Sequence, residues 1–200
     1  MLSADDKPKP GLRERKKAKT RAAIQRCALR LFMEQGYEET TIEQIAEAAE
    51  VSPSTFFRYF PTKEDVALYD DLDPVLIASF NAQPAEMNPI QAMRAALRAV
   101  FESLPHEELE RQWERSSLLL TVPELRMRLL DQFTDLNSEM TQMIAKRARR
   151  RPDDFAVRAY SGALLGALLT SIFDGVGETL DHFLARMDAT LEYLETGLRL

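Results

Sequence analysis

The segment VSPSTFFRYFPTKED, residues 51–65, most narrowly limits how this chain can fold. Ser52 is a favourable N-cap residue, and Pro53 suits the first turn of a helix, where its missing N–H has no partner to lose. Pro61 cannot continue a helix, because its ring clashes with the preceding turn. The segment therefore predicts a short helix whose start and end are both determined by the local sequence.

The two faces of this short helix differ in chemistry. At about 100° per residue, Phe56 and Phe60 fall on one side, with Tyr59 close to them. Ser54 and Arg58 fall on the opposite side. Short polar side chains at a helix N-terminus, followed one turn later by an arginine, suit insertion into the major groove of DNA. We therefore expect one aromatic face that anchors the helix and one polar face that contacts DNA.

Two helices are predicted before this segment and one after it, in a helix-turn-helix order. A long helix begins near Leu12, with apolar residues at spacings of three and four, and ends at Gly36. The second helix is short and ends near Glu50. It begins with a capping box, for which the candidates are Thr41 with Gln44 and Thr40 with Glu43. Thr62 caps a fourth helix, whose N-terminus and Lys63 are suited to hold a phosphate.

The charge of the chain is unevenly distributed. The net charge is −6, which taken alone argues against a nucleic-acid partner. Residues 1–30, however, hold ten Lys/Arg and three Asp/Glu, a net of +7, whereas residues 31–70 have a net charge of −7. We expect residues 1–12 to be a disordered basic arm, and we expect Lys16 and Lys17 to contact DNA phosphates. The alternative is a solvated charged tail without a partner.

The runs LFMEQGYEETTIEQIAEAA and VSPSTFFRYFPTKED together resemble the DNA-binding domain of the TetR family of transcriptional regulators. The resemblance covers residues 13–70 and implies a three-helix helix-turn-helix DNA-binding domain. Glu50 stands where the family often has Gly or Ala, and Phe57 stands where it often has Tyr, a change that removes a phosphate hydrogen bond. The resemblance implies that the following residues face DNA: Thr41, Ser52, Ser54, Thr55, Phe57, Arg58, Tyr59 and Lys63.

Residues 71–200 are predicted to form a larger helical domain for ligand binding and dimerisation. The chain is 45% hydrophobic and 29% charged with seven Gly, and its long stretches carry helical rather than alternating periodicity, so an all-α fold is expected. One long helix is predicted from about Pro123 to Ala148. The segment YDDLDP (69–74) lacks the Gly and the distal Glu of an EF-hand, so we interpret it as a solvated connector and not as a metal site.

Two helices near the C-terminus are predicted to form the interface of a homodimer. Residues 159–173 contain no charged side chain, but fifteen residues are too few to span a bilayer, so no membrane partner is expected. One face of this helix carries small residues, which allow a second helix to approach closely. A four-helix bundle with one hairpin from each copy would bury this face, as in dimers of the TetR family. The expected interface residues are Gly162, Ala163, Gly166, Leu184 and Leu191.

A small-molecule site is predicted among the middle helices of the second domain. Eight Met and ten Phe favour an adaptable apolar cavity, although a Met stripe is also common in a filled core. The expected lining residues are Trp113, Met127, Phe133 and Met140. For an anionic ligand, the candidate partners are Arg115, Arg126 and the basic run KRARRR (146–151). The alternative role of that run is to complement the C-terminus of a helix.

The sequence does not favour catalysis. His106 and His182 are isolated, and neither has a metal-ligand spacing. Cys27 lies on the apolar stripe of the first helix, which favours a buried thiol over a nucleophile. We therefore expect no enzyme activity, no cofactor and no metal. The single cysteine and an N-terminus without an apolar signal segment favour a cytoplasmic location.

The leading hypothesis is a ligand-responsive transcriptional regulator, in particular a repressor, that binds a palindromic DNA operator as a homodimer. Family resemblance alone suggests a small hydrophobic or acyl-type effector. One alternative is a ligand-independent architectural DNA-binding dimer. Another is a small-molecule-binding or catalytic helical bundle. Specific binding to one palindrome in the presence of competitor DNA separates the first hypothesis from both alternatives.

Overall fold

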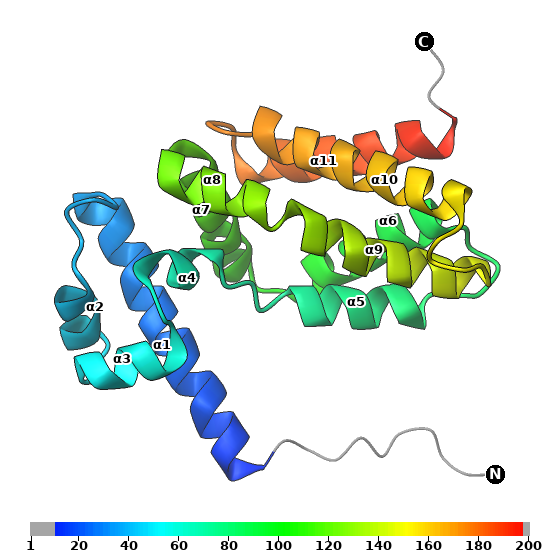
Figure 1. The fold of residues 1–200 in the computed structure, drawn as a ribbon. Helices are drawn as coiled ribbons and strands as arrows, with labels where there is room; N and C mark the ends of the chain where they lie inside the picture. Colours follow the sequence, from blue (N-terminus) through cyan, green and yellow to red (C-terminus); the bar gives the residue numbers. More distant parts are fainter. Residues whose placement is uncertain (1–10, 198–200) are drawn as a thin grey trace. The chain divides into compact units, whose positions relative to one another are not determined.

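The computed structural model describes residues 11–197 and contains no strand among them (Figure 1). The all-α fold expected from the sequence is confirmed. The chain divides into two compact units, residues up to Tyr69 and residues from Asp70 onward, and each unit is described by itself. The basic arm expected at residues 1–12 lies almost entirely outside the described residues, and Leu12 already belongs to the first helix.

The N-terminal unit consists of four helices: α1 (Leu12–Gln35), α2 (Ile42–Ala48), α3 (Pro53–Tyr59) and α4 (Lys63–Leu68). Of the two capping boxes considered for α2, the one with Thr41 and Gln44 forms. The Gln44 N–H donates to Thr41 Oγ1 at 3.2 Å, and the Thr41 N–H donates to the Gln44 side chain at 2.8 Å. Thr40 is buried instead, and its hydroxyl donates to the Gly36 carbonyl at 2.7 Å. Side-chain chemistry therefore determines where α2 starts.

The short helix α3 begins and ends where its cap and its prolines predict. The Thr55 N–H donates to Ser52 Oγ at 3.2 Å, and Phe60 leaves the helix in an extended conformation before Pro61. Phe56 and Phe60 are 0% and 2% exposed, so the aromatic anchor is confirmed. Burying each ring contributes about 1.5–3 kcal/mol, which stabilises a helix that is too short to persist alone.

Polar contacts tie both ends of α4 to the rest of the N-terminal unit. The buried side-chain amide of Gln25 donates to the Val66 carbonyl at 3.1 Å and to the Tyr69 carbonyl at 2.7 Å. Carbonyls in the last turn of a helix lack intrahelical hydrogen-bond donors, and Gln25 supplies a donor to these two carbonyls. At the other end of α4, Lys63 Nζ donates to the Tyr37 carbonyl at 2.8 Å. Helix α4 is therefore held by α1 and by the loop that follows α1.

Seven helices make up the described part of the C-terminal unit: α5 (Asp73–Ala82), α6 (Pro89–Ser103), α7 (His106–Thr121), α8 (Pro123–Asp131), α9 (Phe133–Ala148), α10 (Phe155–Asp174) and α11 (Leu180–Glu195). Two features differ from the sequence-based expectation. The single helix expected over residues 123–148 is interrupted at Gln132. Helix α5, which the sequence patterns do not predict, begins within the segment expected to be a connector.

Two apolar clusters form the core of the C-terminal unit. The first joins α5, α6, α9, α10 and α11, and includes Phe80, Met93, Ile144, Leu164 and Leu191. The second cluster is smaller. It consists of Leu109 from α7 and of Leu180, Phe183 and Met187 from α11. Helices α10 and α11 lie side by side, as Figure 1 shows. Because α11 contributes to both clusters, its position determines the packing of both.

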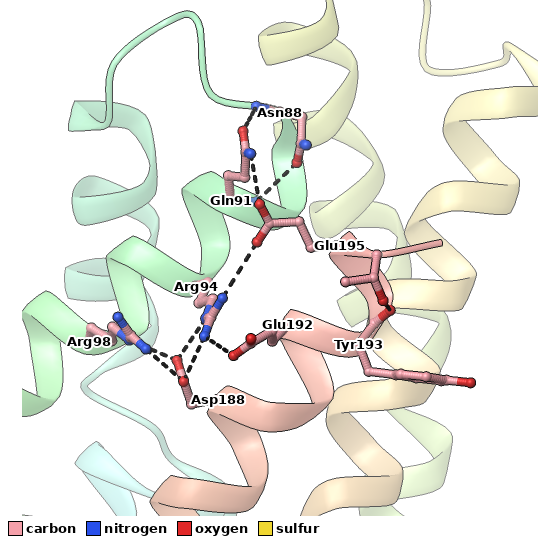
Figure 2. Close-up of polar contacts among 9 residues, drawn as sticks. Asn88, Gln91, Arg94, Arg98, Asp188, Glu192, Tyr193 and Glu195 are labelled. Atoms are coloured by element: carbon pink, nitrogen blue, oxygen red, sulfur yellow. Dashed lines mark hydrogen bonds and ion pairs between the residues drawn. The ribbon is translucent and has the colours of Figure 1, made fainter. Parts of the chain in front are cut away.

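A polar network at the surface ties α6 to α11 (Figure 2). Arg94 Nε donates to Asp188 Oδ1 at 2.8 Å, and Arg98 Nε donates to the same oxygen at 2.7 Å. Arg94 also donates to Glu192 and forms an ion pair with Glu195. The hydrogen bonds from the two arginines are the main cause of a lowered pKa of the Asp188 carboxyl. The charged form of this carboxyl therefore stabilises the contact between α6 and α11.

Arg147 has a structural role that the sequence patterns do not reveal. Its guanidinium donates to four backbone carbonyls at the end of α5 and before α6, those of Phe80, Gln83, Pro84 and Met87. In the same basic run, Arg150 pairs with Asp154 and Arg151 pairs with Asp153. These contacts favour a structural interpretation of residues 146–151 over an anion-binding one.

Replacing Asp188 with Asn should destabilise the C-terminal unit at neutral pH by about 1–2 kcal/mol, because the charge shared by two arginines is lost. A carboxyl whose pKa is lower in the folded state than in the unfolded state stabilises the folded state. This contribution is complete at a pH above the unfolded-state pKa of about 3.9, and it is lost as the pH falls toward the folded-state pKa. The difference between variant and wild type should therefore shrink below about pH 4. Urea unfolding followed by the fluorescence of Trp113, the single tryptophan, measures this unit directly.

Asp153→Asn is the matched control, because both side chains of the Arg151–Asp153 pair are largely exposed, at 83% and 65%. Its loss should cost less than about 0.5 kcal/mol. Equal losses in the two variants would show that the α6–α11 network contributes no more than an ordinary surface ion pair.

Candidate nucleic-acid interface and ligand cavity

The outward face of α3 carries the polar residues that the sequence predicts. Ser54, Phe57 and Arg58 are exposed, and the exposed fraction of Phe57 is 51%. The Arg58 guanidinium lies 5.4 Å from the centre of the Tyr59 ring, a cation–π contact that holds it near the helix. This face offers a hydroxyl, an apolar ring and a guanidinium, which are groups that contact base edges in a major groove.

The other residues expected to face DNA have mainly local contacts. Ser52 Oγ donates to Thr55 Oγ1 at 3.0 Å and lies 2.9 Å from Ser54 Oγ, in addition to capping α3. Thr41 caps α2 and remains exposed. The ammonium of Lys63 already binds two backbone carbonyls near the start of α2. Direct DNA contacts by these residues therefore stay a prediction.

A groove beside α3 brings together residues from two separate parts of the sequence. Its volume is about 740 Å³, and it lies between the first turns of α1 and the end of α3. The lining residues are Leu12, Arg13, Glu14, Lys16, Lys17, Thr20, Arg58 and Tyr59. Four cations face one carboxylate, so the groove is suited to a chain of phosphates.

The sequence presents the basic helix and the recognition helix as two unrelated features. In the structure, Lys16 and Lys17 share the groove with Arg58 and Tyr59. Phosphate contacts position a protein on DNA, whereas base contacts specify the sequence. The two sets of predicted residues therefore form one surface on which both kinds of contact are possible.

A cavity of about 210 Å³ lies within the C-terminal unit. Its walls come from α5, α6, α7, α10 and α11 and are mostly apolar; they include Leu97, Phe101, Trp113, Phe183, Leu184 and Met187. Trp113 and Phe183 are stacked, with ring centres 4.3 Å apart. The cavity is therefore bounded on one side by an aromatic wall that α7 and α11 build together.

Two of the five predicted ligand residues line this cavity, and three do not. Trp113 and Arg115 lie in its wall. Met127 and Phe133 are 61% and 37% exposed, on α8 and at the start of α9. Met140 packs against the first core cluster. A ligand-binding role of these three residues has no support from this cavity and stays a prediction.

The course of the chain through α8 explains why Met127 and Phe133 lie outside the cavity wall. Leu125 is the residue that this nine-residue helix buries, and the helix ends at Gln132 before α9 begins. No residue of α8 lines the cavity, and residues of α5 and α11 contribute to the wall instead. Phe183, Leu184 and Met187 do stand out in the sequence as an apolar stripe, but a stripe does not distinguish a cavity wall from a core or an interface.

One end of the cavity is polar. Arg115 is 6% exposed, forms an ion pair with Asp70, and donates from Nε to Gln112 Oε1 at 3.0 Å. The Gln112 side chain in turn donates to Asp71 at 3.2 Å. Because a carboxylate of the chain already neutralises the guanidinium, the structure does not favour Arg115 as the partner of an anionic ligand.

Asp73 lies at the same polar end. The residue is exposed to solvent, and its carboxyl has no hydrogen bond or ion pair within residues 11–197. Partial desolvation raises the pKa of this carboxyl to about 6, repulsion from Asp70 and Glu139 adds to this, and Arg115 opposes it. Asp73 therefore changes its charge in a mildly acidic range, unlike an ordinary aspartate.

The outward face of α10 is apolar and open. A Cβ added to Gly162 or Gly166 would meet nothing within 4 Å in this chain. Ala163 is exposed, and the exposed fraction of Phe155 is 86%. Nothing within residues 11–197 covers this face at the two glycines, so the three small residues remain candidates for a dimer interface.

Leu184 and Leu191, predicted for the same interface, face inward. Leu191 is 1% exposed in the first core cluster, and Leu184 lines the cavity. Leu191 belongs to the buried stripe of α11, which counts against a role in the interface, whereas Leu184 is only partly buried and its role there stays a prediction. By length and composition alone, α10 is the one helix among the described residues that could cross a membrane. It buries Leu164 and Leu165 within the unit, as a core helix does.

The residues considered for catalysis have ordinary contacts. Cys27 is half-buried, and its thiol donates to the Ala48 carbonyl at 3.2 Å. His106 lies near Glu110 on the surface of α7, and His182 is exposed on α11. No cluster of three or more His, Cys, Asp or Glu that could hold a metal ion occurs in the part of the chain that the structure describes.

Comparison with known proteins extends over both units. The family model described as "Bacterial regulatory proteins, tetR family" matches residues 24–69, and the model described as "MftR C-terminal domain" matches residues 87–199. Over 197 residues the chain is 38% identical to the HTH-type transcriptional regulator TcmR of Streptomyces glaucescens, covering 94% of this chain and 83% of TcmR.

Solved structures show the same fold. A TetR-family transcriptional regulator from Syntrophomonas wolfei superimposes with a TM-score of 0.66 at 23% identity, over 92% of this chain and 98% of that one. FadR from Thermus thermophilus, a TetR-family repressor in complex with lauroyl-CoA, superimposes with a TM-score of 0.59 at 26% identity, over 90% and 95% of the two chains.

Gly175 packs tightly against the aromatic wall of the cavity, since a Cβ there would lie 2.8 Å from Trp113 Cη2 and 3.2 Å from Phe183 Cδ2. Gly175→Ala should displace the indole, destabilise the C-terminal unit by about 1–3 kcal/mol and shift the tryptophan emission to longer wavelength. Emission spectra and urea unfolding measure these effects. Val176→Ala, at the exposed neighbouring position, is the control and should change neither quantity. An unshifted emission maximum in Gly175→Ala would contradict the close packing.

Proposed function

The chain belongs to the TetR family of DNA-binding transcriptional regulators, and we propose that it is a repressor released from a palindromic operator by a small apolar molecule. The observation that carries this proposal is the combination of an exposed recognition face on α3 with a basic groove beside it. The proposal needs no catalysis and no cofactor, and it places the protein in the cytoplasm, with the DNA.

The DNA-binding part of the proposal assigns a role to each set of residues. Ser54, Phe57 and Arg58 enter the major groove, because they are exposed on the side of α3 opposite its buried rings. Lys16 and Lys17 contact phosphates from the adjoining groove. In a symmetric dimer, the two α3 helices would enter successive major grooves about 34 Å apart, so the operator would be a near-palindrome.

The dimer part of the proposal rests on α10. Its outward face carries Gly162, Ala163 and Gly166, and no part of residues 11–197 lies within 4 Å of a Cβ added to either glycine. Small residues allow two helix backbones to approach closely, and a two-fold symmetric contact of this face with its copy would remove it from water.

The ligand part of the proposal rests on the cavity of the C-terminal unit, whose walls are mostly apolar. A mostly apolar pocket with a few polar groups at one end is the usual form of a small-molecule site. The description of Thermus thermophilus FadR in complex with lauroyl-CoA supports an apolar effector in a relative of this fold. A ligand-independent architectural protein is the second candidate, but that function does not require a cavity.

Arg58→Ala should weaken binding to the specific operator by about 1–3 kcal/mol and should reduce the preference for that operator over random DNA. The reason is that Arg58 is an exposed donor on the recognition face. The operator can be selected from randomised duplexes, and affinity can then be measured by gel shift in the presence of competitor DNA.

Arg30→Ala is the matched control, because Arg30 lies exposed on α1, pairs with Glu34 and does not line the groove. It should leave the specificity unchanged. An equal loss by Arg58→Ala on operator and random DNA would show that Arg58 contacts only phosphate. Equal binding of wild type to every duplex would favour the architectural alternative.

Gly166→Arg should produce monomers and lower the affinity for the operator about 100-fold or more, because linked binding of the two half-sites is lost. Within one chain the position is open, so the substitution acts on a partner and not on the fold of the unit. Sedimentation velocity measures the oligomeric state, and gel shift measures the affinity.

Ala99→Arg is the control for adding the same side chain to an exposed helix position, here on α6. It should stay dimeric and should bind the operator as wild type does. A soluble, dimeric Gly166→Arg variant would place the interface elsewhere on the molecule.

A further inference from the structure

We propose that the cavity of the C-terminal unit takes a compact aromatic molecule with a cationic group such as a protonated amine, its rings in the apolar part and its cation beside Asp73. This inference rests on the function proposed above and specifies its effector. Four observations support it: the volume of the cavity, the use of its donors, its unpaired carboxyl and its aromatic wall.

The volume of the cavity limits the size of the ligand. A protein cavity of about 150 Å³ lined by apolar side chains holds one benzene molecule. The cavity here, of about 210 Å³, therefore has room for one ring or two fused rings with a short substituent. Pockets for drug-sized ligands usually measure about 300–1,000 Å³, so this cavity does not enclose a long acyl chain along its full length.

The hydrogen-bond donors of the cavity wall are already used. The Arg115 guanidinium is held by its ion pair and by Gln112. The Trp113 indole N–H donates to the Glu178 carbonyl at 3.2 Å, and the Ser116 hydroxyl donates to a backbone carbonyl at 2.9 Å. A carboxylate or phosphate on a ligand would have to displace one of these partners, and removing a partner from a buried group is costly.

Asp73, in contrast, is an acceptor without a partner. Its carboxyl has no hydrogen bond or ion pair within residues 11–197, and the residue lines the same end of the cavity as Asp70 while remaining exposed to solvent. Arg115, the cation at this end, is matched by Asp70, so ionised Asp73 leaves a negative charge to be neutralised. Residues 71–200 hold 14 Lys/Arg and 20 Asp/Glu, a net of −6, so the wider field also attracts a cation and repels a polyanion.

The aromatic wall favours the same class of ligand. Trp113 and Phe183 are stacked, and Phe101 lies in the same cavity. Flat rings pack well against such a wall. The faces of aromatic rings also attract cations, and indole does so most strongly. An aromatic amine can use the rings for its body and the carboxylate for its charge.

The test compares three probes of nearly equal shape and different charge: naphthylmethylamine, naphthylmethanol and naphthoate. Calorimetry with the wild-type dimer at pH 7.5 should show the amine binding about tenfold more tightly than the alcohol, and the alcohol more tightly than the acid. The acid and lauroyl-CoA should bind most weakly. The same probes are then tested for release of the operator in a gel shift.

Two variants assign the preference to one carboxyl. In Asp73→Asn the amine and the alcohol should bind with about equal affinity, and the alcohol should bind as it does to the wild type, since only the charge is removed. Asp131→Asn is the control, because Asp131 is exposed at the end of α8 and does not line the cavity. It should keep the preference of the wild type.

Lowering the pH to 5 gives an independent measurement. The groups that influence Asp73 are Asp70, Glu139 and Arg115, and together with partial desolvation they raise the Asp73 pKa to about 6. At pH 5 the carboxyl is mostly neutral while the amine keeps its proton, so the preference should fall in the wild type and stay near onefold in Asp73→Asn.

Equal binding of amine and alcohol by the wild type, a preference for naphthoate or lauroyl-CoA, or no binding of any probe would overturn this inference. The function proposed above is tested separately by operator release. Release by lauroyl-CoA or by the neutral probe alone would reject the cationic effector and leave a ligand-responsive repressor. Tight, Asp73-dependent binding of the amine without release would support the cation site and count against its use in repression.

Discussion

The burial of Phe56 and Phe60 is the interaction on which the DNA-binding surface depends. Helix α3 has only seven residues, and a helix of that length does not persist in water unless it packs against other elements. Both anchoring rings lie on one side, so the opposite side, with Arg58, contributes nothing to the core and is available for a partner. The C-terminal unit repeats this division, because α10 buries Leu164 on its inner side and leaves Gly162 with open space on its outer side.

Local chemistry explains why so much of the N-terminal unit could be predicted from the sequence. The caps formed by Thr41, Ser52 and Thr62 act within one helical turn, so residues near in sequence decide where α2, α3 and α4 begin. Even here the sequence allowed two starts for α2. The choice against Thr40 depends on its hydroxyl donating to the Gly36 carbonyl, a contact that a capping pattern does not contain.

The ligand cavity could not be predicted in the same way, because helices distant in sequence form its walls. Met127 and Phe133 have suitable side chains, but the interruption at Gln132 leaves them exposed instead of enclosed. Arg115 and Arg147 are equally plausible anion partners in the sequence. In the structure one is neutralised by a carboxylate and the other binds four backbone carbonyls, and only these partner atoms separate a structural arginine from a ligand-binding one.

A ligand in such a cavity affects DNA binding only if it prefers one arrangement of the protein over another. Asp70 follows Tyr69 directly at the junction of the two units and pairs with Arg115 in the cavity wall, so the polar end of the cavity includes the first residue of the C-terminal unit. A hundredfold preference for the released arrangement supplies about 2.7 kcal/mol for each site. Linkage requires that the operator weaken ligand binding by the same factor. A compound whose affinity is the same with and without operator therefore cannot be the effector, however tightly it fits the cavity.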